Sequence, residues 1–141
     1  MKTWSALYLL IWITFIQIMI ILFPIFGLTP AYYIHGAVGV AVVGVAMYSY
    51  SLVKKTSCPD RIKRISKTTA ILGGVQGILG LILFAGVVMF NFGSTILNIV
   101  LLLHAVNALA IITQAASSAT AFDMWEEKEF LVQGQDSTLT K

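Results

Sequence analysis

The chain has 141 residues, of which 58% are hydrophobic and only 11% are charged, and its formal net charge is +3. Soluble domains carry roughly a quarter charged residues, so this composition excludes an ordinary soluble enzyme and indicates that lipid is the main solvent. The sequence has no basic face on a folded domain, and we therefore expect no nucleic-acid partner.

Four apolar runs follow one another along the chain, at about 4–26, 31–53, 69–90 and 96–122. Each exceeds the roughly 20 residues that a helix needs to cross the hydrocarbon layer. Because backbone groups in lipid must pair within their own helix, and the connections are short, the sequence predicts an all-α membrane protein. We expect an antiparallel bundle of four transmembrane helices over 1–125 and a polar tail over 126–141.

Basic residues are concentrated in the predicted loop 54–67, which contains Lys54, Lys55, Arg61, Lys63, Arg64 and Lys67. The two opposite loops, around 27–30 and 91–95, contain no charged residue. By the positive-inside rule the basic loop is cytoplasmic, and an even number of spans brings both termini to the same side. We therefore expect a multi-pass protein of the cell membrane whose basic loop contacts anionic head groups.

Two histidines lie inside apolar runs, His35 in the second and His104 in the fourth. An ionisable side chain in lipid is costly, so it usually faces a partner, a cavity or a cofactor. Counting from the outer ends of these runs, His35 lies roughly 7 Å deep and His104 roughly 13 Å deep, on helices that run parallel. Helix tilt can close this difference, and both residues lie in the outer half of the membrane. Two imidazoles placed in this way could hold haem iron from both sides, and the alternatives are hydrogen-bonded core histidines or a proton relay.

The third and fourth runs carry small and polar residues at helical spacing. Gly73 and Gly77 match the close-approach motif of membrane helices, which favours backbone packing, although glycines beside a histidine could also leave a slot for a macrocycle. A stripe on the fourth run is expected to face the bundle interior, with Gln17 and Gln76 as cross-helix partners. Its members are His104, Asn107, Ile111, Gln114 and Ser118. For the amides, hydrogen bonds that hold the bundle are the favoured interpretation.

The last part of the chain is acidic and polar, beginning with Asp123, Glu126, Glu127 and Glu129. We expect 123–132 to continue the fourth helix and Ser137 and Thr138 to be frayed. A solvated tail is favoured over an acidic docking surface for a partner.

The placement of the histidines resembles one four-helix unit of the haem A synthase family. The segments that carry the resemblance are Tyr-Tyr-Ile-His-Gly-Ala-Val-Gly at 32–39, Leu-Gly-Gly-Val-Gln-Gly-Ile-Leu-Gly at 72–80 and Leu-Leu-His-Ala-Val-Asn-Ala-Leu-Ala at 102–110. The resemblance covers most of the chain as a single unit. It implies that His35 and His104 are haem ligands. It also implies that the unit pairs with a second copy or joins a larger complex.

The sequence also departs from that family. The catalytic half of the family has Glu-x-x-His-Arg in its second helix, and here Tyr32 stands at the acid position and Gly36 at the arginine position. Without these groups we expect no haem hydroxylation, and no catalysis by the chain on its own. Haem b binding between His35 and His104 remains, with Tyr32, Gln76, Asn107 and Gln114 as secondary polar contacts.

Two functions follow from these observations. The first is an integral-membrane, cytochrome b-like subunit in which two histidines bind haem b for electron transport, or which anchors a membrane redox complex such as a respiratory complex. The alternative is a cofactor-free accessory or assembly subunit of a larger membrane enzyme. A transporter is disfavoured because the four runs contain no Asp, Glu, Lys or Arg within their apolar stretches.

Overall fold

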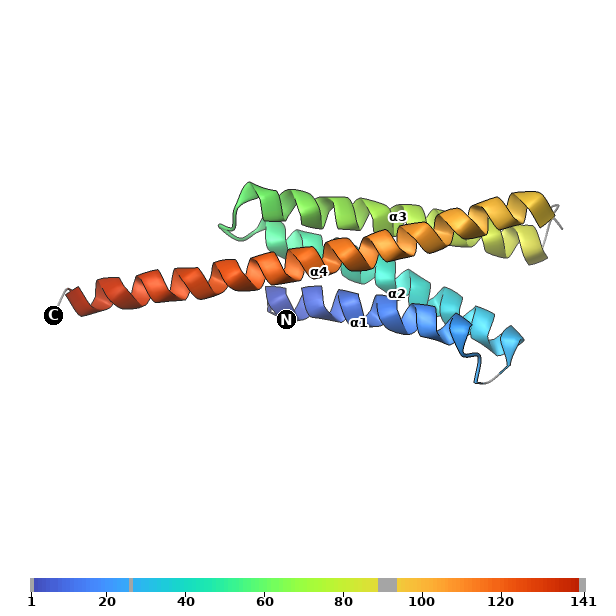
Figure 1. The fold of residues 1–141 in the computed structure, drawn as a ribbon, viewed down its shortest axis with the longest axis horizontal. Coiled ribbons are helices and arrows are strands. Elements are labelled where there is room, and N and C mark those ends of the chain that lie inside the picture. The colour runs from blue at the N-terminus through green and yellow to red at the C-terminus, as the bar shows by residue number, and fades with distance from the viewer. Residues whose placement is uncertain (1, 26, 89–93, 140–141) are drawn as a thin grey trace.

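The computed structural model describes residues 2–25, 27–88 and 94–139, and these contain four α-helices and no strand. The helices are α1 (Thr3–Leu22), α2 (Leu28–Lys54), α3 (Asp60–Val88) and α4 (Ser94–Leu139) (Figure 1). All four are long and apolar enough to cross a membrane. The prediction of an all-helical chain with four helices of spanning length is therefore confirmed.

The helices form a closed ring in which each helix packs against the one that follows it in the chain, and α4 packs against α1. Successive helices run in opposite directions (Figure 1), as short connections require. The helices α2 and α4 consequently run in the same direction and face each other across the diagonal of the bundle. This diagonal is where the two histidines lie.

The start of α3 differs from the sequence-based prediction. The helix begins at Asp60, so Arg61, Lys63, Arg64 and Lys67 lie on its first turns, and the connection between α2 and α3 is only 55–59. Helix continues through this charged stretch because one of its faces is apolar or small and buried, with Ile62 at 5% and Ser66 at 2% exposure. The prediction of a basic loop over 54–67 was therefore wrong in its extent, although its charges do gather at one end of the bundle.

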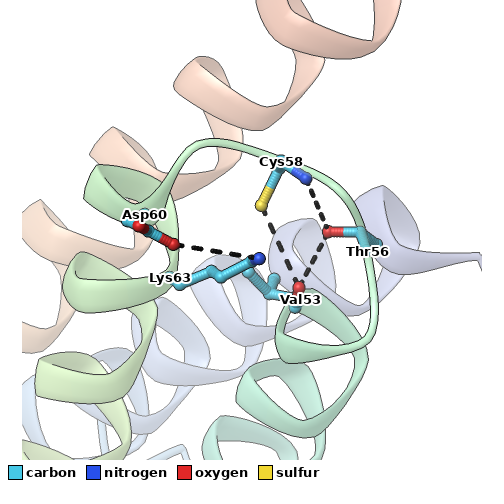
Figure 2. A network of polar contacts seen from close by, with 5 residues as sticks. All are labelled: Val53, Thr56, Cys58, Asp60 and Lys63. Carbon is cyan, nitrogen blue, oxygen red and sulfur yellow. Dashed lines mark hydrogen bonds and ion pairs between the residues drawn. The ribbon is translucent and has the colours of Figure 1, made fainter.

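The short connection is held by local contacts at this corner (Figure 2). The Thr56 hydroxyl donates to the Val53 carbonyl at 2.8 Å, and the Cys58 thiol lies 3.9 Å from the same oxygen. Cys58 is buried, and Lys63 lies 4.0 Å from Asp60 across the first turn of α3. We call the end of the bundle that carries the basic residues of 54–67 the basic end. The opposite end, toward which His35 and His104 lie, is the histidine end.

Two clusters of buried side chains form the core. The first contains Leu7, Val53, Cys58, Ile62, Ala119 and Phe122, and the second contains Leu10, Val42, Ala46 and Ala115. Between α2 and α3 the packing is closest at two glycines. A Cβ atom added at Gly73 would lie 3.2 Å from the Ala46 Cβ, and one at Gly77 would lie 3.3 Å from the Val43 Cγ2. The predicted close-approach motif is confirmed.

The last helix is much longer than the other three. It continues without a break past Phe122 to Leu139 and extends beyond the other helices at the basic end (Figure 1). Ser137 and Thr138 lie within the helix, and their fraying stays a prediction. On this extension the side chains of Phe130 and Leu131 are each 66% exposed.

Candidate functional site

The two histidines meet in the interior of the bundle. His35 projects from α2 and His104 from α4, and their ring centroids lie 6.1 Å apart with the ring planes inclined by 52°. Both residues are half-buried. The helices α2 and α4 are diagonal to each other in the bundle. Their two imidazoles nevertheless lie side by side, at the same height along the bundle axis.

His35 is fixed by a reciprocal pair of hydrogen bonds to Gln17 of α1. The His35 Nδ1 lies 2.9 Å from the Gln17 carbonyl oxygen, and the Gln17 Nε2 donates to the His35 carbonyl oxygen at 2.7 Å. The sequence predicted that Gln17 would be a hydrogen-bond partner of the polar stripe on the fourth run. Its side chain bonds to α2 instead, so that prediction was wrong.

His104 has a different environment. Its ring lies against Gly80 of α3, where an added Cβ would be 3.4 Å from the His104 Cε1. The His104 Nδ1 and the Gln17 Oε1 are both buried and have no hydrogen-bond partner among the described residues. Buried polar atoms without partners are uncommon because each one costs free energy, and the Ser118 Oγ, fourteen positions further along α4, is a third such atom.

One turn after His104, Asn107 links α4 to α3. Its Nδ2 donates to the Gln76 Oε1 at 2.7 Å and to the Leu72 carbonyl at 3.0 Å. The predicted partnership between Gln76 and the stripe on α4 is therefore confirmed. These bonds fix the height of α4 relative to α3, and with it the level at which His104 enters the core.

The other two predicted polar contacts lie away from the pair. Gln114 is half-buried but ten positions after His104, roughly 15 Å further along the helix axis. Tyr32 lies one turn before His35, and its side chain is 56% exposed, so it is at the surface of the bundle. The structure brings together His35, His104 and Gln17, with Gln76 and Asn107 nearby.

Two features of this site were missed at the level of sequence. The bonds between Gln17 and His35 depend on the register of α1 against α2, which no spacing within one helix reveals. Gly39 lies four positions after His35, on the same face of α2. A glycine on the face of a polar residue could have indicated that another helix approaches closely there. A Cβ at this position would lie 2.9 Å from the Gln17 Nε2.

Within the described ranges, no group of three or more His, Cys, Asp or Glu side chains could hold a metal ion. Among these four residue types, the two imidazoles are therefore the side chains that could bind a metal ion at this position. Comparison of the chain with protein-family models, with curated proteins and with solved structures gives no match. The function must therefore be inferred from the sequence and from the geometry of these residues.

Proposed function

We propose that the chain is a multi-pass membrane protein that binds one haem b between His35 and His104, for electron transfer or as the anchor of a membrane redox complex. The observation that carries this proposal is the meeting of the two rings across the diagonal of the bundle, 6.1 Å apart. Imidazole is a common axial ligand of haem iron, and the porphyrin itself supplies the remaining ligands.

The separation of the rings fits this role. A metal–imidazole bond is about 2 Å long, so two rings whose centroids lie 6.1 Å apart could both reach one metal ion placed between them. The donors themselves, two imidazole nitrogens on facing helices, are of the kind that binds haem iron.

Each residue of the site has a distinct part in the proposed function. His35 and His104 would hold the iron, and haem bound there would supply one-electron transfer. The hydrogen bonds from Asn107 to Gln76 and Leu72 hold α4 in register with α3, so that His104 stays opposite His35.

The charge distribution supports one orientation in the membrane. Lys54 ends α2 and Lys55 follows it, and four further basic residues lie on the first turns of α3. The start of α1 and the end of α4 lie at this same end of the bundle (Figure 1). By the positive-inside rule we propose that the basic end is cytoplasmic and that the histidine end lies in the outer half of the cell membrane.

An absorption spectrum of the dithionite-reduced protein tests the haem proposal. Protein purified from a haem-producing host, or loaded with haem b, should show a Soret band and the sharp visible bands of a six-coordinate haem. His35→Ala and His104→Ala should each abolish that six-coordinate spectrum, whereas Gln114→Leu, which lies far from the pair, should retain it. An unchanged spectrum in His35→Ala would overturn the proposal.

A second candidate function is that of a cofactor-free accessory subunit of a larger membrane complex. The extension of α4 favours it, because this segment leaves the bundle and exposes Met124, Phe130 and Leu131 next to four acidic residues. Colourless protein that purifies in fixed stoichiometry with a larger complex, and loses that complex when 126–141 are removed, would support this function instead.

A further inference from the structure

One of the two hydrogen bonds between Gln17 and His35, from the ring to the Gln17 backbone carbonyl, determines where the proton of the neutral imidazole lies. A carbonyl oxygen can only accept a hydrogen bond, so the His35 Nδ1 that lies 2.9 Å from the Gln17 oxygen must carry the hydrogen. In the neutral ring the Nε2 then keeps its lone pair. That nitrogen is the one left to bond to a metal.

The second bond keeps this arrangement in place. The Gln17 Nε2 donates to the His35 carbonyl at 2.7 Å, so the same two residues are joined in both directions between α1 and α2. The amide can lie there because position 39 is glycine. A Cβ at Gly39 would be 2.9 Å from the Gln17 Nε2, a separation that real Cβ atoms essentially never show.

We propose that Gln17 and Gly39 are positioning residues for His35, which hold its ring in the Nδ1–H form with Nε2 free to bond to haem iron. This inference rests on the proposed function. Metal-bound histidines commonly donate their second N–H to a backbone carbonyl, which fixes the tautomer and the ring orientation. His104 has no such partner for its Nδ1 among the described residues, so the two ligands are unequal.

The chain offers a matched pair of substitutions to test this inference. Gly39→Ala places a methyl group against the Gln17 amide, whereas Gly36→Ala, on the same helix one residue from His35, has nothing within 4 Å of its Cβ. Gln17→Leu removes the amide without adding bulk at position 39, so it provides a second variant should Gly39→Ala disturb the packing of α1 against α2.

The first measurement requires no haem. In protein labelled with ¹⁵N-histidine and held in nanodiscs, the nitrogen shifts of His35 should show the Nδ1–H form in the wild type and in Gly36→Ala. Gly39→Ala and Gln17→Leu both keep the Gln17 backbone carbonyl but lose the amide bond that holds α1 beside His35. The contact from Nδ1 to that carbonyl should therefore lengthen, and the shifts should move toward a mixture of the two forms. A wild-type ring in the Nε2–H form, or variants that leave the tautomer unchanged, would overturn the inference.

The second measurement uses the haem-loaded protein. We expect Gly39→Ala and Gln17→Leu to weaken haem binding by about 10- to 100-fold and to shift the electron paramagnetic resonance signature of the ferric iron. Gly36→Ala should match the wild type. Haem binding that is equal in all four proteins would contradict the inference alone, whereas a wild type that binds no haem would contradict the proposed function and leave the tautomer result standing.

Discussion

The two halves of this bundle are held together by different kinds of contact. Toward the basic end lie the most fully buried side chains, at 2% exposure or less, which are Phe122, Leu7, Leu10, Ile111, Val53, Ser49 and Ser118. Toward the histidine end, half-buried polar residues are joined across helices by hydrogen bonds, and these are Gln17, His35, Gln76 and Asn107. One half is closed by packing and the other is held by directional contacts.

This difference suggests a division of labour within a small chain. Filled interiors contribute most of the packing energy, whereas binding regions tend to come from less stable parts of a structure. A fully packed interior around His35 and His104 would leave no room for a ligand between the helices. The following substitutions would break or sharpen this comparison.

The largest effect on stability should come from the packed half. Phe122 is 2% exposed, and its ring lies 5.3 Å from that of Trp125, so Phe122→Ala should lower the free energy of unfolding by about 3 kcal/mol or more. Chemical unfolding in detergent, followed by circular dichroism, measures this loss. Phe130→Ala, the same change at a site that is 66% exposed on the same helix, serves as the control. Equal losses in the two variants would show that the basic half is not closed by packing.

A smaller loss should follow from disrupting the contact between α2 and α3. Gly73→Leu forces these helices apart, because even a Cβ at this position lies 3.2 Å from the Ala46 Cβ, and we expect a cost of about 1–3 kcal/mol. Gly74→Leu is the control, since nothing lies within 4 Å of its Cβ. The same unfolding measurement applies. If the two leucine variants unfold alike, close approach does not determine the packing of this pair.

The polar half should show a weaker but specific coupling. Replacing Asn107 with Leu removes its bonds to Gln76 and Leu72, and we expect a loss of about 1 kcal/mol, as for other hydrogen bonds between membrane helices. A double-mutant cycle with Gln76→Leu isolates the side-chain bond. Additive losses in that cycle would mean that directional contacts do not hold this half together.

The smallest effect should come from the surface of the basic end. Asp60 and Lys63 lie 4.0 Å apart, and the Asp60 side chain is 94% exposed. Asp60→Asn should therefore change the free energy of unfolding by less than about 0.5 kcal/mol, with little dependence on salt concentration. A loss above 1 kcal/mol that disappears at high salt would show that charge, and not only packing, stabilises the basic half.

Much of the fold was readable from hydropathy. Runs of apolar residues predicted the helices, and helical spacing predicted that Asn107 would face the third helix and find Gln76. Hydropathy also misplaced the start of α3, because the charges of 61–67 hid the buried Ile62 and Ser66 on the opposite face. Average hydropathy does not distinguish a charged loop from a charged helix that has one buried face.

The candidate site was only partly readable, for a different reason. The depth of His35 and His104 follows from counting residues along each helix, but the partner of Gln17 depends on how far α1 slides against α2. That register is set by contacts between helices, such as the fit of the Gln17 amide over Gly39. A single sequence describes each helix well and the offset between two helices poorly.

The diagonal position of the histidines has a consequence for the order of events during synthesis. His35 is carried by the second helix and His104 by the last, so a growing chain possesses only one member of the pair until α4 has entered the membrane. A ligand that needs both rings cannot be captured earlier, when three helices are in place. If the chain binds haem as proposed, completion of the last helix is the step that permits binding, and a chain that ends before α4 lacks one of the two rings.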